Sequence, residues 1–487
     1  MTNISRDGSG GVPMRGHAAA VGRFAAMGLA FSLLAACGGG GAGGGGAKVP
    51  GGGPVDSQGN AINKAAQDAY RDGLAKMAQH DKANDWTDAD CAATAALFDK
   101  ANEQQDGGLL RAQYNAGVAH SRCKQVDKAK AYFGGILAKD AKFHRARVQV
   151  ALYDYAKSKD IEKAIAEMKQ AITDAEFKNE EALVNLAIFQ MSRDSSQGES
   201  GCEDDFACAK LNLQRALAIN DSFMPAFNQL AVYYLQSAKK QAGKKTGSKT
   251  SGSAKRSNVN KQALELAELV CSQALRKNPN YAPVHNTSGL ISSELGNLSA
   301  AARSFGLARK LDPKFFEAHM NYAAVNLKFR GFKQAQAAYQ DAIKLQPNDY
   351  EAYLGLALAV RGLITPQNEG AMVAESEKHL QKAKSIAPDR PETYYNEAIL
   401  TQEFKAREGG TAAEPMLNKA KGLFQQFIAK AEGKDGFEES IDTAKERMEE
   451  IDQTIAFNKQ TAEMQKQMEQ MRKQEEARKQ LEEKKEK

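Results

Sequence analysis

The sequence predicts an all-α fold, a solenoid of paired helices that ends in a long charged helix. Pro279, Pro313 and Pro347 fall 34 residues apart. A period of this length is typical of a helix–turn–helix repeat. Small and aromatic residues recur in step between the prolines: Gly289, Ala301, Phe305 and Ala308 become Ala323, Ala335, Tyr339 and Ala342 one period later. The single Trp and the 7% aromatic content suit an Ala-rich helical array.

Each recurring residue type has a physical reason to be where it is. Only a small side chain allows two helices to cross closely, so we expect Gly289 and Ala323 at helix crossings. Phe305 and Tyr339 are expected to fill the space between helices. The proline follows the second helix and ends it, because proline lacks an N–H and restricts the residue before it.

At these residues the chain resembles the tetratricopeptide repeat (TPR) family, over about residues 110–430. The resemblance implies a right-handed superhelix whose first helices line a concave peptide-binding groove. It says little about function, because the same repeat is used for many tasks. In its Gly-rich and Ala-rich composition the chain also resembles TPR proteins of the myxobacterial gliding machinery, although no diagnostic motif supports this second resemblance.

The N-terminus is predicted to be a targeting segment. Arg15 and Arg23 precede an apolar run, 24–36, that is too short to span a bilayer. The run closes on Leu34-Ala35-Ala36-Cys37, which resembles a bacterial lipobox. We therefore predict a lipoprotein signal peptide over 1–36 and lipidation of Cys37. The alternative is an ordinary signal peptide with a chance cysteine. Residues 37–59 are Gly-rich and are predicted to form a flexible tether.

Residues 60–109 are predicted to form a degenerate N-terminal helix pair. Its first helix, Asn60–Gln79, has apolar residues on one face, and Thr87 is expected to cap the second. That face comprises Ala66, Ala69, Tyr70, Leu74 and Met77. The TPR solenoid is predicted over 110–435, and its first helices are expected to begin near Leu110, His144, Glu180, Met224, Tyr281, Tyr350 and Pro391.

Two segments depart from the repeat in charge. Residues 237–260 carry seven basic and no acidic side chains, whereas the whole chain has a net charge of only +6. Lys, Gly and Ser without apolar residues cannot pack, so we predict a disordered basic insert there. The near-neutral remainder argues against a nucleic-acid-binding body. Residues 436–487 mix both charges and are predicted to form a charged C-terminal helix. No regular heptad is visible, which makes coiled-coil pairing the minor alternative.

The cysteines are candidates for disulfides if the chain is exported. Cys202 and Cys208 flank an acidic insert, and Cys91 and Cys123 lie in neighbouring helix pairs, so each pair is a candidate disulfide. Cys271 takes a core position of its helix and is expected to be a buried thiol. No Cys/His spacing supports a metal site, and the sequence therefore predicts no metal.

The predicted groove supplies the candidate binding residues. Four Asn side chains fall two residues before the small residue of a helix crossing and could hold the backbone of an extended peptide. Asn at this position is also common in the TPR family, so these residues could equally mark typical repeats. The complete set of candidates for a partner-binding groove is Asn115, Asn185, Asn228, Asn286, Asn321, Lys328 and Asn396.

The sequence thus predicts a scaffold and not an enzyme. We expect protein partners in a bacterial cell envelope, membrane attachment through the lipid anchor, and a location at the outer membrane facing the periplasm. We expect no cofactor, no nucleic acid and no small-molecule substrate. The envelope complex could serve secretion, outer-membrane assembly or surface and gliding motility. The alternative function is an accessory module of a cell-wall or polysaccharide-export enzyme system.

Overall fold

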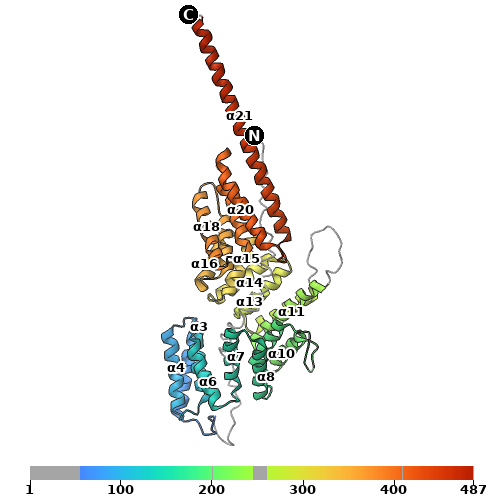
Figure 1. Cartoon of the computed structure of the whole chain (residues 1–487). Coiled ribbons are helices and arrows are strands. Elements are labelled where there is room, and N and C mark those ends of the chain that lie inside the picture. Colours follow the sequence, from blue (N-terminus) through green and yellow to red (C-terminus); the bar gives the residue numbers. More distant parts are fainter. Residues whose placement is uncertain (1–54, 200, 245–259, 408–409, 486–487) are drawn as a thin grey trace. The chain divides into compact units, whose positions relative to one another are not determined.

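The computed structural model describes residues 55–199, 201–244, 260–407 and 410–485 (Figure 1). Helices are the regular elements throughout this described part, apart from one isolated antiparallel bridge between Val55 and Ala61. The predicted all-α fold is therefore confirmed. The described residues form two compact units, 55–313 and 314–485. Cys37 and the predicted signal peptide lie outside the described residues.

The first unit contains the helices from α3 to α14, which pack against one another in chain order. Their bounds are α3 Lys64–Ala83, α4 Asp88–Glu103, α5 Leu110–Arg122, α6 Val126–Lys139, α7 His144–Ser158, α8 Ile161–Asp174, α9 Glu180–Arg193, α10 Asp205–Ile219, α11 Met224–Lys244, α12 Lys261–Lys277, α13 Ala282–Glu294 and α14 Leu298–Leu311.

The second unit continues the helix pairs and ends in the long helix α21. Its helices are α15 Phe316–Lys328, α16 Phe332–Leu345, α17 Tyr350–Gly362, α18 Glu369–Ile386, α19 Pro391–Leu400, α20 Glu414–Ala431 and α21 Glu438–Lys485. A π-helical turn, η2 (Thr401–Lys405), extends α19, and a 3-10 turn, η3 (Gly410–Ala413), precedes α20. The predicted charged C-terminal helix is present as α21.

The repeat pattern locates the helices well. Leu110, His144, Glu180, Met224, Tyr350 and Pro391 each begin a helix as predicted, and Tyr281 is the N-cap of α13. The small residues lie at close helix crossings, as predicted. A Cβ atom on Gly289 would lie 2.5 Å from Cε1 of Phe305, and one on Gly117 would lie 2.7 Å from Cε1 of Phe133. Only glycine allows these two helix pairs to close on their aromatic rings.

The N-terminal helix pair departs from the prediction in two places. The first helix, predicted over Asn60–Gln79, runs over Lys64–Ala83, because Asn63 caps its N-terminus. Thr87 caps α4 in a capping box with Asp90, which confirms its predicted role. Leu74, however, was predicted to face the core and is 42% exposed. Gly73 takes the core position instead, where a Cβ would lie 2.8 Å from Cε1 of Phe98. The Phe98 ring needs a residue without a side chain opposite it, and this turns Leu74 outward.

The tether predicted over 37–59 is too long at its C-terminal end. Val55 and Asp56 are buried, and the Asp56 carboxylate accepts hydrogen bonds from the backbone N–H groups of Gln58 and Asn60 at 2.9 Å each. Nε2 of Gln105 donates to the same carboxylate at 2.7 Å. Gln105 thus fastens this segment to the end of the first helix pair, while Gln58 and Asn60 hold the segment's own turn.

The prediction of a disordered insert over 237–260 is wrong for its first eight residues. Helix α11 continues to Lys244, and Ala238 is completely buried. Nζ of Lys239 lies 2.7 Å from Glu294, and Lys240 pairs with Asp194. Two carboxylates on neighbouring elements therefore hold lysines that the sequence alone presents as solvated. At the other end, Asn260 caps α12; residues 245–259 lie outside the description.

Candidate partner-binding site

The predicted groove amides are buried or half-buried, and three of the six, Asn115, Asn228 and Asn396, bond to a neighbouring first helix. Nδ2 of Asn115 donates to Oη of Tyr70 at 3.0 Å, linking α5 to α3. Oγ1 of Thr287 donates to Oδ1 of Asn228 at 2.8 Å, linking α13 to α11. Asn185 instead donates to the carbonyl of Glu181 in its own helix at 2.9 Å. These contacts give the amides a structural role, and a peptide-binding role for them stays a prediction.

The remaining candidates differ in exposure. Asn286 and Asn321 are buried, whereas Lys328 is exposed at the last residue of α15. Asn396 is 4% exposed, and its Nδ2 donates to the carbonyl of Glu392 at 2.8 Å. Its Oδ1 accepts a hydrogen bond from Nη1 of Arg361 at 3.2 Å. The contacts of Asn396 thus lead to Arg361, a charged neighbour from another first helix.

Arg361 is the unusual residue in this region. It lies on the last turn of α17 and is partly buried. No carboxylate of the described residues comes within 4.0 Å of its guanidinium, and Asn396 is its hydrogen-bond partner. A guanidinium has five N–H donors. Burial lowers the pKa of Arg361, and Glu403 opposes this effect from a distance. The group is a partly desolvated cation that lacks an ion-pair partner.

A second arginine reaches the same place from α21. Nη1 of Arg447 donates to Oε1 of Gln402 at 3.1 Å, and Nη2 lies 3.1 Å from Oε1 of Glu403. Gln402 and Glu403 belong to the π-helical turn η2, and such turns are frequent at functional sites. The Glu403 carboxylate thus pairs with Arg447 and acts on Arg361 only from a distance, so the cluster of Arg361, Arg447 and Glu403 has an excess positive charge.

Arg390, in the same unit, is an arginine whose charge is paired within the fold. Arg390 also joins α17 to α19, with Nη2 2.7 Å from Oε1 of Glu351 and Nε 3.0 Å from Oε2 of Glu392. Its guanidinium lies over the ring of Tyr350 at 4.5 Å. With two carboxylates around one guanidinium, this cluster is neutralised within the fold. The Arg361 cluster lacks that neutralisation, so an external anion bound there would neutralise its excess positive charge.

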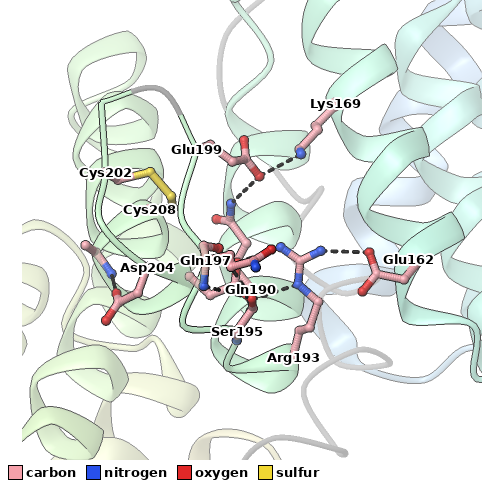
Figure 2. Close-up of polar contacts among 12 residues, drawn as sticks. Glu162, Lys169, Gln190, Arg193, Ser195, Gln197, Glu199, Cys202, Asp204 and Cys208 are labelled. Atoms are coloured by element: carbon pink, nitrogen blue, oxygen red, sulfur yellow. Dashed lines mark hydrogen bonds and ion pairs between the residues drawn. A yellow bond between two sulfur atoms is a disulfide. The ribbon is translucent and has the colours of Figure 1, made fainter.

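The acidic insert between α9 and α10 is held by a buried ion pair (Figure 2). Nη2 of Arg193 lies 2.6 Å and Nε 2.8 Å from the two carboxylate oxygens of Asp205, which is completely buried. The same guanidinium reaches Oε2 of Glu162 on α8 at 2.7 Å. The backbone N–H of Ser195 also donates to Asp205, at 2.9 Å. These contacts tie both ends of the segment between α9 and α10 to the helix array.

The cysteines pair as the candidate disulfides proposed. Cys91 and Cys123 form a disulfide with their Cα atoms 6.3 Å apart, and Cys202 and Cys208 form one with their Cα atoms 5.1 Å apart. The second joins the end of the segment between α9 and α10 to the first turn of α10 (Figure 2). Cys271 is a buried free thiol, and burial raises its pKa to about 12. Burial and a protonated sulfur together make Cys271 a packing residue.

Sequence reasoning missed Arg361 and Arg447. Arginine near a helix end is common on protein surfaces, so neither residue stood out. One signal was present: Ile441, Met448 and Ile455 repeat at helical spacing and pack on the last helix pair. That pattern indicates that the start of α21 packs as a further first helix of the array. Arg447 therefore lies beside η2, the turn that extends the preceding first helix, α19.

The geometry defines a helical-repeat solenoid, which is the architecture that the TPR resemblance implies. No protein-family model matches the chain. The Hsp70-Hsp90 organizing protein of Triticum aestivum is 27% identical over 121 residues, which are 25% of this chain and 20% of that protein. The match therefore spans about a fifth of that relative's length.

Solved structures similar to this chain are TPR proteins. A thermophilic TPR protein of Thermus thermophilus has 22% identity and a TM-score of 0.35, and the match covers 45% of this chain and 99% of that one. A tetratricopeptide repeat protein of Parabacteroides merdae has 15% identity and a TM-score of 0.35, over 63% of this chain and 98% of that one. Among the described helices, none combines the length and the apolar character that crossing a membrane requires.

Proposed function

We propose that this protein is a lipid-anchored scaffold of a bacterial cell envelope, and that it binds an acidic segment of a protein partner at Arg361 and Arg447. The observation that supports the binding site is the partly buried guanidinium of Arg361, which has an amide partner and, among the residues that the structure describes, no carboxylate within ion-pair distance. An unpaired charge in a partly desolvated place is costly, and a ligand carboxylate would remove that cost.

The chemistry of the cluster favours a carboxylate over an apolar or cationic ligand. Arginine presents its N–H groups in a planar fork that matches a carboxylate with two parallel hydrogen bonds. Hydrogen bonds to charged groups contribute about 1.5–3 kcal/mol each. The contributing residues come from α17, from η2 after α19 and from α21, so one extended segment could touch all three. Aspartate or glutamate side chains of a partner would meet these requirements.

The scaffold role has support from outside the site. The Triticum aestivum relative is by its name an organizer of two other proteins, and we carry over only the general task of bringing proteins together. An array that is built from helix pairs exposes a long row of first helices, which suits contact with extended segments.

A peptide-binding measurement tests the site. The probe is a fluorescein-labelled decapeptide of alternating Glu and Gly, and the readout is fluorescence polarisation with the full chain. We expect Arg361→Gln to weaken binding about tenfold, because a lost charged hydrogen bond costs at least about 1.4 kcal/mol. Lys333→Gln removes the same charge from an exposed residue on α16, a second helix of the same unit, and is the control. Equal losses in the two variants would show general charge attraction and would rule out a specific site.

The proposed anchor has its own test. It rests on the Leu34-Ala35-Ala36-Cys37 sequence after an apolar run. A single acyl chain holds a protein only marginally, whereas several chains attach it firmly. Cys37→Ala should therefore release the protein from membranes into the soluble envelope fraction. Retention of the variant on salt-washed membranes would contradict the anchor. Affinity purification from crosslinked cells would then identify the partner and decide which envelope complex is served.

A further inference from the structure

The long helix α21 has two apolar faces, of which the repeat array covers one. Ala444 and Ile451 are buried in the core of the last helix pair, with Met448 and Ile455 packed beside them. Beyond this point α21 runs on past α20 (Figure 1). Four large apolar side chains on this outer part are 49–66% exposed: Phe457, Met464, Met468 and Met471.

The exposed side chains follow a seven-residue spacing. Phe457, Met464 and Met471 are seven apart, and Met468 lies four residues after Met464. At 100° per residue these four side chains form one stripe, roughly opposite the stripe that packs on the array. In heptad terms Phe457, Met464 and Met471 take position d, and Thr454, Thr461 and Met468 take position a. This register holds over three heptads, residues 453–473. It does not show as a regular heptad in the sequence alone, because Thr454 and Thr461 place polar side chains at two of its a positions.

The residues beside the stripe are amides with one exception, and this indicates the kind of partner. Gln453, Gln460 and Gln467 occupy position g, and Asn458, Gln465 and Arg472 occupy position e. The charged residues of 453–471 all lie at positions b, c and f on the far side: Lys459, Glu463, Lys466 and Glu469. A partner helix with charged flanks would find one ionic partner here, Arg472 at the last e position.

We propose that the outer part of α21 pairs with the same helix of a second copy of this chain, as a parallel two-stranded coiled coil. In such a pair each d residue faces its own copy, and position g lies beside position e of the partner five residues on. Gln453 then meets Asn458 of the second copy, and Gln460 meets Gln465. A side-chain amide carries both a donor and an acceptor, so these contacts are self-complementary. A symmetric interface requires that self-complementarity.

The pairing is expected to be weak, because three heptads with methionine in the core specify a dimer less firmly than Ile and Leu. It is also expected to leave the repeat array unchanged. The contacts that anchor α21 to the last helix pair use the opposite face, so dimerisation adds an interface and does not compete with one.

Sedimentation velocity on the full chain in mild detergent tests the proposal. We expect a concentration-dependent monomer–dimer equilibrium. Met464→Glu places two like charges against each other in the core, and it should raise the dissociation constant at least about tenfold. Gln470→Glu adds the same charge at the exposed position c and should change the dissociation constant less than about twofold. Circular dichroism of both variants checks that helicity is kept.

Disulfide crosslinking in intact cells tests which face of α21 forms the dimer interface. Met464→Cys should yield a reducible dimer on a non-reducing gel, whereas Lys466→Cys, at position f, should not. A chain that stays monomeric at about 100 µM would overturn the proposal, since even weak coiled coils associate in that range. Equal effects of Met464→Glu and Gln470→Glu would overturn it too, as would a dimer formed by the Lys466→Cys variant and not by Met464→Cys. In those cases the Met stripe would serve a different protein.

Discussion

Gln149 on α7 donates a hydrogen bond of 2.6 Å to the carboxylate of Glu181 on α9, and this pair joins two neighbouring first helices. Burial raises the pKa of Glu181 to about 7, against the opposing effects of Arg145 and Gln149. The carboxyl group therefore changes its charge near neutral pH. It is the kind of group that makes stability depend on pH where most carboxylates do not.

The direction of that dependence follows from proton linkage. The folded-state pKa of Glu181 lies above the ordinary value of 4.5, so the folded protein binds the proton more tightly than the unfolded chain. Its contribution to stability is complete below pH 4.5 and is lost as the pH rises to about 7. We expect Glu181→Gln to flatten the fall in melting temperature between pH 5 and pH 8, measured by circular dichroism. An unchanged slope in the variant would contradict this prediction.

A second prediction concerns the helix crossing at Gly289. Its added Cβ would lie 2.5 Å from Phe305, so Gly289→Ala must displace a buried ring. We expect a loss of about 1–3 kcal/mol in the free energy of unfolding. Gly134 is the matched control, because a Cβ there has nothing within 4 Å. Gly134→Ala should stabilise α6 by about 0.5–1 kcal/mol, since alanine favours helix. Urea unfolding of both variants gives the comparison, and a stabilised Gly289→Ala variant would be the contrary outcome.

A third prediction concerns the ion pair in the acidic insert. Asp205→Asn would leave Arg193 without its buried carboxylate, which typically costs about 3–5 kcal/mol. Glu162→Gln removes the other acidic partner of the same guanidinium, but the Glu162 side chain is 68% exposed, and the loss should stay below about 1 kcal/mol. Urea midpoints measure both. Equal losses would show that burial of Asp205 does not set the strength of the pair.

A fourth prediction ranks the two disulfides. Cys91 and Cys123 are 32 residues apart, whereas Cys202 and Cys208 are six apart. In the chain-entropy account a longer closed loop stabilises more, by about 3–4 kcal/mol for the first and about 2 kcal/mol for the second. Replacing Cys91 and Cys123 together with serine should therefore lower the melting temperature more than replacing Cys202 and Cys208. The reverse order would favour strain or residual structure over loop entropy.

The fold could be predicted from the sequence because the residues that define each helix pair recur at a regular spacing. Gly289, Phe305 and Pro313 each mark one place in a 34-residue unit, so helix starts far along the chain follow from a few clear repeats. Single contacts between units carry no such periodicity. The outward turn of Leu74 depends on the Phe98 ring, and the helical course of Lys239 depends on Glu294. Neither partner is visible from local pattern.

The candidate site was harder to predict for the same reason. The Asn positions could be found by repeat spacing, but spacing does not tell whether an amide is free or bonded to the next helix. Asn396 is informative only because Arg361 contacts it. Arg447 enters from a helix outside the regular repeats, and Glu403 lies in a π-helical turn that interrupts the helical register. Each of these departures from regularity removes the basis of a repeat-based prediction.

The short segment before α3 determines how the array responds to a mechanical load. The backbone N–H and Oγ of Ser57 both donate to the carbonyl of Gly108, at 3.1 and 2.7 Å, and Gln105 holds Asp56. Gln105 and Gly108 lie in the turn between α4 and α5. A pulling force on the chain before Val55 would therefore act first on the turn between α4 and α5, and not on α3. Helix α3 is not peeled off first, and the force instead must break several hydrogen bonds at once before any helix unravels.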